Sequence, residues 1–134
     1  MRFVISFCAV ALMAIVVSKP AFAIKPFGDQ FGRIYVETSK NEDFKKLVAE
    51  AKCNVCHIDG KNKKEHNPYG LVLKEAGFSK KTHEPMFKNN PEQFKKEVEA
   101  ILKKVEDKKI DGKGKTFGEK IKDGVLPGGD TKGK

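Results

Sequence analysis

The sequence predicts an all-α fold of three or four helices joined by long loops. Apolar residues repeat at helical spacing, most strictly between Pro91 and Asp107, where they fall at i, i+4, i+7, i+8 and i+11. No stretch shows the apolar–polar alternation that indicates a half-buried strand. The connections between the helical stretches are long, which is uncommon in a compact domain unless they wrap around something.

The first residues predict a secretory signal peptide. Met1 and Arg2 give a positive start, an uncharged apolar run follows from Phe3 to Val17, and Ala21-Phe22-Ala23 is a small-x-small cleavage signal. We therefore expect residues 1–23 to be removed and residues 24–134 to form one exported domain, in the periplasm or another extracytoplasmic space. No transmembrane segment would remain after cleavage; the alternative is a retained N-terminal anchor.

Two helical stretches precede the first cysteine of the mature chain. Residues 27–35 carry apolar side chains at helical spacing, but Gly28 and Gly32 weaken the pattern, so we expect a short helix or a packed extended arm. Residues 41–52 carry a clear apolar stripe, with Ser39 or Asn41 as the candidate cap. This second helix is expected to run directly into the cysteine pair.

The middle of the chain alternates between helices and irregular connections. Residues 57–67 are polar and predict a loop, after which Pro68 opens a helix that ends near Gly77. Residues 79–90 are expected to form a second irregular connection. Pro91 then opens the longest helix, over residues 91–106.

The C-terminal part is rich in glycine and lysine. A short helix is predicted from Thr116 to Asp123, with Thr116 as cap and Glu119 at the capping-box position. From about residue 127 onward the tail is expected to fray.

The mature chain holds only two cysteines, Cys53 and Cys56, because Cys8 lies in the signal segment. A disulfide across two intervening residues closes a tiny loop and constrains little of the unfolded chain. With His57 the pair forms C-x-x-C-H, the pattern typical of covalent c-type haem attachment. Cys53 and Cys56 would form thioether bonds to one haem c, and His57 would ligate its iron.

A zinc module is the main alternative use of these residues. Zinc could be held by Cys53 and Cys56 with two of His57, His66 and His83, but the usual histidine pair is three to five residues apart, and His66 and His83 are much farther apart. A thioredoxin-like redox pair would need a βαβ pattern, which the sequence does not show.

The segments CNVCH and HNPYG, the latter at residues 66–70, resemble the monohaem cytochrome c family, and in particular small exported bacterial members with a CNVCH motif. The resemblance implies a cytochrome c-like fold in which helices 41–52 and 91–106 cross near the haem. It also implies that Pro68 and Tyr69 contact the cofactor, with the Pro68 carbonyl accepting a hydrogen bond from the His57 imidazole.

The second axial ligand of the iron is predicted to be Met86, the one methionine left after signal cleavage. His83, His66 or an open position are the alternatives. A thioether ligand raises the reduction potential, whereas a second imidazole lowers it.

These features predict a soluble electron carrier and no enzyme. The alternative is a haem protein with an open distal side, suited to gas sensing or weak peroxidase activity. Of the formal charge of +9, Arg2 and Lys19 leave with the signal peptide, and the remaining +7 favours acidic or membrane-bound redox partners. Nucleic acid is not expected as a partner, because the chain is exported and its lysines are mixed with glutamates without aromatic residues between them. The basic residues expected to surround the haem edge are Lys52, Lys61, Lys63, Lys64, Lys80, Lys81 and Lys88.

Overall fold

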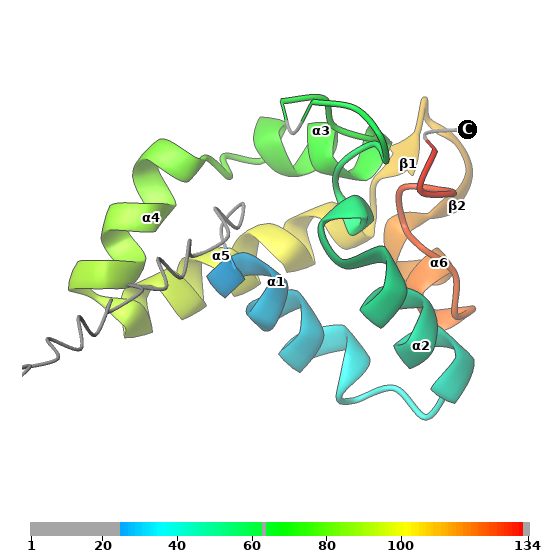
Figure 1. Cartoon of the computed structure of the whole chain (residues 1–134), viewed down its shortest axis with the longest axis horizontal. Coiled ribbons are helices and arrows are strands. Elements are labelled where there is room, and N and C mark those ends of the chain that lie inside the picture. The colour runs from blue at the N-terminus through cyan, green and yellow to red at the C-terminus, as the bar shows by residue number, and fades with distance from the viewer. Residues whose placement is uncertain (1–24, 63, 133–134) are drawn as a thin grey trace, which may run out of the picture.

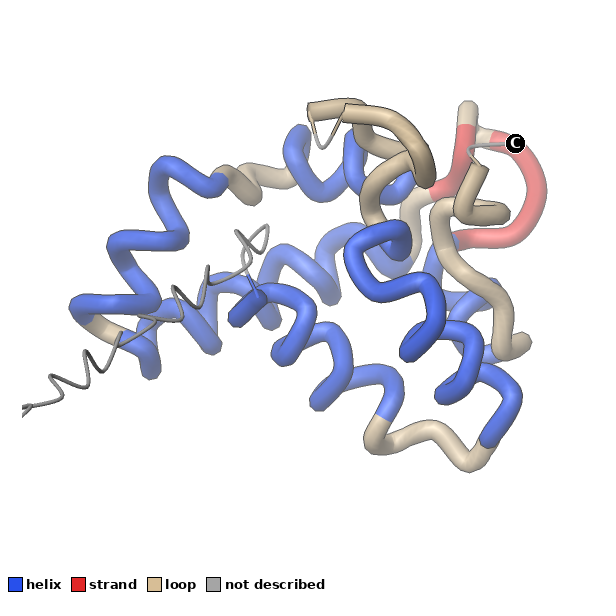
Figure 2. The backbone as a smooth tube through the Cα atoms, viewed as in Figure 1, coloured by secondary structure: helices blue, strands red, loops and turns tan. Residues whose placement is uncertain are grey.

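The computed structural model describes residues 25–62 and 64–132, so the predicted signal peptide and Lys63 lie outside the described residues. Helices make up most of the described chain (Figures 1 and 2). The helical class is therefore confirmed. The expected number of three or four helices is wrong, because the described residues form six α-helices, a π-helical turn and a 3-10 turn.

The first helical stretch is a helix rather than an extended arm. Helix α1 (Lys25–Phe31) continues into the π-helical turn η1 (Gly32–Val36). Phe27 and Phe31 are buried, and the buried Gln30 side chain donates from Nε2 to the carbonyl of Lys95 at 3.3 Å. This face of α1 packs against the long helix of the C-terminal half.

Helix α2 (Glu42–Ala51) begins as the sequence predicts. The Asn41 side chain caps it by accepting from the amide of Phe44 at 3.0 Å, and Glu42 and Asp43 occupy the positive first turn. The helix ends in the 3-10 turn η2 (Lys52–Val55), which contains the first cysteine of the motif.

Helix α3 (Pro68–Glu75) confirms the prediction, but residues 79–90 do not form the expected irregular connection. They fold as helix α4 (Lys80–Asn89), capped by Ser79, whose hydroxyl accepts from the amide of Thr82 at 3.2 Å. Ion pairs join Glu84 to Lys80 at 3.8 Å and to Lys88 at 3.5 Å along its outer face. This helix was not predicted from the sequence, because the segment has a weak apolar stripe and contains Pro85.

Helix α5 (Pro91–Glu106) is the centre of the fold. Its apolar stripe is fully buried at Phe94, Val98, Leu102 and Val105, and α1, α3 and α4 pack against it. Helix α2 is not among its main contacts in the described chain, so the expected crossing of residues 41–52 with residues 91–106 is not found. The N-terminal helix that packs on α5 is α1 (Figure 1).

A small antiparallel hairpin follows α5, contrary to the expectation that no strand forms. Strand β1 (Lys109–Ile110) pairs with β2 (Lys113–Thr116). Asp111 and Gly112 connect them, both at positive φ (51° and 68°), as a two-residue hairpin turn requires. Strands this short cannot show alternation, but the Asp-Gly pair was a readable signal.

The final helix α6 (Phe117–Lys122) has the predicted capping box. Thr116 Oγ1 accepts from the amide of Glu119 at 3.1 Å, and the Glu119 carboxylate accepts from the amide of Thr116 at 2.7 Å. The following tail, expected to fray, packs on the body of the protein: Pro127 and Gly128 are buried, and the Thr131 carbonyl accepts from the amide of Asp59 at 2.7 Å.

Within the described residues, no helix combines the length and the apolar character needed to cross a bilayer.

Candidate functional site

The CNVCH segment forms a single tight turn at the end of α2. The carbonyl of Cys53 accepts from the amides of both Cys56 and His57, at 3.2 and 3.1 Å. Both cysteines are reduced and partly buried. The turn therefore gathers the two thiols and the imidazole of the predicted site within one hydrogen-bonded unit.

Burial raises the pKa of the Cys56 thiol to about 12, with a smaller contribution from Cys53. The thiol of Cys56 is consequently protonated near neutral pH. A cysteine of this kind is a weak nucleophile until an attacking partner or a change in its surroundings favours the thiolate.

The backbone is strained immediately before the first cysteine. Lys52 has φ 50° and ψ −116°, a conformation that favours glycine because a Cβ is crowded there. Such strain costs of order 1–3 kcal/mol and persists only where the surrounding structure enforces it. The strain lies between α2 and Cys53, so it sets the direction in which the motif leaves the helix.

His57 is oriented by the loop that follows it. Its Nδ1 donates to the carbonyl of Glu65 at 3.3 Å, and its ring lies 4.6 Å from the ring of His66. Because a carbonyl can only accept, this bond requires the proton on Nδ1. The carbonyl expected in this role was that of Pro68; the structure instead uses Glu65, three residues earlier.

Asn67 ties the motif to helix α3. Its side-chain Nδ2 donates to the carbonyls of Asn54 (3.3 Å) and Val55 (2.9 Å), and its backbone amide donates to the carbonyl of Cys56 at 3.0 Å. Its Oδ1 accepts from the amide of Gly70 at 2.9 Å, which caps α3. Asparagine before a helix-opening proline is a recognisable cap, but the bonds from Asn67 to the turn have no signal in the sequence.

Gly70 allows this close approach. A Cβ at this position would collide with the carbonyl of Cys56 and crowd the Cβ of His66. Both Asn67 and Gly70 thus belong to the site through contacts that only the folded chain reveals.

Tyr69 is also brought to the motif. Its side chain is 1% exposed and packs against Phe31 and Phe117, and its hydroxyl is buried without a hydrogen-bond partner. Burial, followed by the nearby Cys56, raises the pKa of this phenol well above its ordinary value. A buried hydroxyl without a partner in the chain has unused capacity to donate to a water molecule or another small polar group.

Met86 and His83 lie apart from the motif. Both are on α4, which occupies one end of the long axis of the molecule, whereas α2 and the turn that follows it lie toward the other end (Figure 1). Met86 is partly buried against the apolar core. His83 is 2% exposed, and its Nε2 lacks a hydrogen-bond partner and lies 4.0 Å from Glu97 Oε2. The structure thus gathers Cys53, Cys56 and His57 in one turn and places Tyr69 near Cys56. Pro68 opens α3 next to Asn67, and Met86 lies on the separate helix α4.

The zinc alternative gains no support. Among residues 25–62 and 64–132, no three side chains of His, Cys, Asp or Glu converge as a metal site would require.

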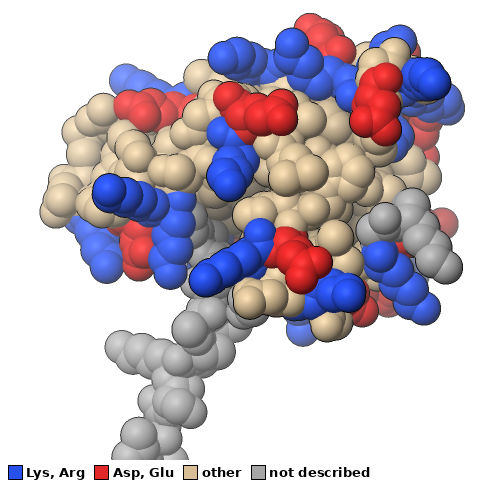
Figure 3. Space-filling view, turned by 90° about the horizontal axis from the view of Figure 1, so that it is seen from above, with Lys and Arg blue, Asp and Glu red and all other residues tan. Residues whose placement is uncertain are grey.

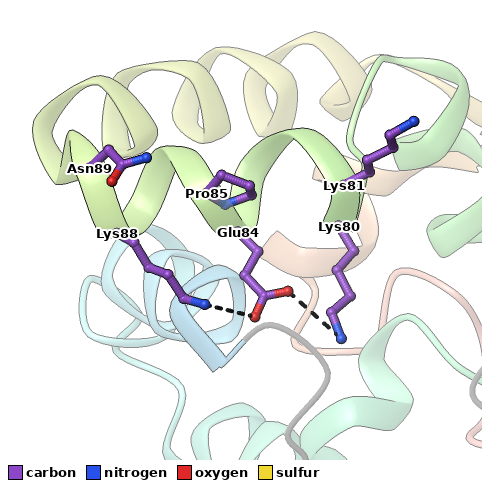
Figure 4. Close-up of a pocket in the computed structure, with 6 residues that line it drawn as sticks. All are labelled: Lys80, Lys81, Glu84, Pro85, Lys88 and Asn89. Atoms are coloured by element: carbon purple, nitrogen blue, oxygen red, sulfur yellow. Dashed lines mark ion pairs between the residues drawn. The ribbon is translucent and has the colours of Figure 1, made fainter.

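The lysines predicted to surround one site fall into two groups. Lys52, Lys61 and Lys64 are exposed near the CNVCH turn. Lys80, Lys81 and Lys88 line a shallow hollow of about 600 Å³ on the outer face of α4. There the Glu84 carboxylate lies between Lys80 and Lys88, while Lys81 points away (Figure 4). Lys63 lies outside the described residues. Seen from above, basic and acidic side chains are interspersed around a broad uncharged area (Figure 3).

Comparison with known proteins identifies no similar family, protein or structure. No protein-family model matches the chain, and neither a search of curated proteins nor a search of solved structures returns a match. The functional argument therefore depends on the residues and their geometry.

Proposed function

We propose that the mature chain is a small exported electron-transfer protein with a cytochrome c-like role, carrying one haem bound covalently to Cys53 and Cys56. The observation that carries the proposal is the CNVCH turn itself, which gathers Cys53, Cys56 and His57 in one hydrogen-bonded unit and orients the imidazole through a backbone carbonyl. Periplasmic or other extracytoplasmic localisation follows from the signal peptide predicted at residues 1–23.

The residues present are those that the cofactor needs. Cys53 and Cys56 would supply two thiols from one turn for the thioether bonds, and His57 would ligate the iron with its ring oriented by the Glu65 carbonyl. A hydrogen bond of this kind fixes the ring and raises its basicity. The buried Tyr69 hydroxyl has unused hydrogen-bonding capacity next to the turn.

The bound haem would supply one-electron redox chemistry. The chain would tether the haem through Cys53 and Cys56 and ligate its iron through His57. The packing of Tyr69 with Phe31 and Phe117 would exclude water from one side of it. Lys52, Lys61 and Lys64 would attract acidic or membrane-bound redox proteins, a contribution that weakens with salt.

Met86 remains the predicted second ligand, but its position leaves a specific alternative. Helix α4 would have to approach the CNVCH turn before Met86 or His83 could ligate the same iron. If α4 keeps the position described here, neither Met86 nor His83 would reach the iron, which leaves His66 or an open position. An open position would admit small ligands and favours gas sensing or weak peroxidase activity as the second candidate function.

The test is expression of the full chain with the export and haem-maturation machinery. We expect the mature protein to carry one covalent haem by intact mass and pyridine haemochrome spectrum, and to lose covalent attachment when both cysteines are replaced by alanine. A colourless wild-type protein would remove the proposal.

The distal side is tested on the same material. Rapid binding of carbon monoxide to the reduced protein favours the open site. A near-infrared band of the ferric protein that disappears in Met86→Ala favours methionine ligation, and the His83→Ala variant serves as its matched control on the same helix.

A further inference from the structure

The hydrogen bonds of Asn67 reach three consecutive carbonyls of the motif, those of Asn54, Val55 and Cys56. We propose that Asn67 is a positioning residue that holds the CNVCH turn in the shape presenting Cys53, Cys56 and His57, and that Gly128 of the C-terminal tail secures it there. We call these hydrogen bonds from Asn67, together with the contact of Gly128 on Asn67, the clamp. The clamp does not depend on the proposed function, but its link to cofactor attachment does.

These carbonyls need partners because the helical turn ends at them. The last carbonyls of a helix have no intrahelical amide to bind, and each one buried without a partner costs about 1–3 kcal/mol. Asn67 is 1% exposed and satisfies all three from a single side chain and its own amide. The shape of the turn is therefore coupled to the start of α3.

The strained backbone of Lys52 is a second and independent sign that the turn is held from outside. A lysine at φ 50° and ψ −116° tends to relax unless the residues on either side are fixed. Helix α2 fixes the preceding side. On the following side, the bonds from Asn67 are what fix Asn54, Val55 and Cys56.

The tail completes the clamp. Gly128 is buried against the Asn67 amide so closely that a Cβ would collide with its Nδ2. Its backbone is not at positive φ, so only this contact excludes a larger residue. Beyond it, the Thr131 carbonyl binds the amide of Asp59, whose carboxylate accepts from Asn54 Nδ2 at 3.2 Å.

The main experiment compares Asn67→Asp with Asn90→Asp in the mature chain without cofactor. Aspartate has nearly the same shape and keeps the oxygen that caps the helix, but it loses the amide donors. Asn90 is an exposed asparagine that caps α5 in the same way, before Pro91. The readout is hydrogen exchange of individual backbone amides.

In Asn67→Asp we expect exchange at the amides of Cys56 and His57 to accelerate by about tenfold or more, since hydrogen bonds worth about 1 kcal/mol each are removed. Protection of the Gly70 amide should remain, because its acceptor Oδ1 is kept. Asn90→Asp should leave all three amides unchanged.

Gly128→Ala keeps Asn67 and displaces it, so it separates loss of the clamp from the added charge of aspartate. We expect the same amides of the CNVCH turn to lose protection. Lys52→Gly, which removes the backbone strain, should partly restore protection in the Asn67→Asp background.

Unchanged exchange at Cys56 and His57 in both Asn67→Asp and Gly128→Ala would overturn the clamp, as would an equal effect of Asn90→Asp. With maturation machinery present, the clamp variants should show a lower fraction of chains with covalent haem than Asn90→Asp. If the wild type gains no haem while the exchange results hold, the proposed function fails and the clamp stands.

Discussion

Two asparagine–proline pairs start helices in this protein, and they illustrate how the same local signal serves different purposes. Asn67 and Asn90 each cap a helix whose first residue is proline, by accepting from the amide three residues later. Asn90 is exposed, and its remaining donor binds Gln93 within its own helix. Asn67 is buried, and its remaining donors bind the CNVCH turn.

Capping depends only on residues next to the asparagine in the sequence, whereas the clamp depends on residues that the fold brings together. Around Asn90 the protein is a scaffold, held by the apolar stripe of α5. Around Asn67 it is a polar junction where a turn, a helix start and the tail meet. Four predictions separate the two regions.

The largest effect is expected in the scaffold. Phe94→Ala should lower the free energy of unfolding by about 3–5 kcal/mol, because a fully buried aromatic side chain in the central helix leaves a cavity. Phe87→Ala, at a ring 40% exposed that packs on Phe94, should cost about 1 kcal/mol. Denaturant unfolding measures both, and equal losses would contradict the scaffold role of α5.

The junction should respond next. Asn67→Ala is expected to cost about 3 kcal/mol, the sum of a lost cap and the carbonyls of Asn54 and Val55 left without their donor. Asn90→Ala should cost about 1 kcal/mol, since only a cap is lost. The same unfolding experiment applies, and similar costs at the two sites would remove the distinction drawn here.

The features that the sequence predicted are the local ones, and those that it did not predict are tertiary contacts. The starts of α2, α3, α5 and α6 were predictable because caps, prolines and apolar stripes are local signals. Cys53, Cys56 and His57 were proposed as a site from their spacing alone, and the structure gathers them in one turn, while their role stays a prediction. The role of Asn67 was not predictable, because its partners lie twelve and thirteen residues away and are backbone carbonyls of no distinctive type.

The errors also have local causes. Helix α4 was missed because a proline stands inside it and its stability comes from a cap, ion pairs and packing on α5. The hairpin was missed because its strands are too short to alternate. The tail was expected to fray because nothing in its composition reveals that Gly128 fits against Asn67.

Relief of strain should produce a smaller effect of opposite sign. Lys52→Gly should raise the free energy of unfolding by about 1 kcal/mol, because glycine adopts this backbone conformation readily. Lys46→Gly, an exposed interior position of α2, should instead lower it by about 1 kcal/mol. Thermal unfolding measures both; destabilisation by Lys52→Gly would show that the turn is not strained.

The two tyrosines should respond with opposite signs. Tyr35 donates to Glu106 at 2.7 Å, so Tyr35→Phe should lower the free energy of unfolding by about 1 kcal/mol. The buried hydroxyl of Tyr69 has no partner, so Tyr69→Phe removes an unsatisfied donor and should raise the free energy of unfolding by about 1 kcal/mol; denaturant unfolding measures both.

Burial is the main cause that raises the pKa of both phenols above the ordinary 10.0, so the folded state favours the neutral forms. Their contribution to stability is therefore complete below pH 10 and falls as the pH rises above it. Tyrosinate absorbance should appear together with unfolding in circular dichroism. Tyrosinate near pH 10 in a chain that remains folded would contradict the burial of these groups.

The most direct test of the account is the covalent state of Cys53 and Cys56 after export and maturation. We predict that peptide mass spectrometry of the purified protein finds one haem attached through both sulfurs on the peptide containing CNVCH, with the characteristic haemochrome spectrum. Recovery of the same peptide with two unmodified thiols, or with a disulfide between them, would contradict it.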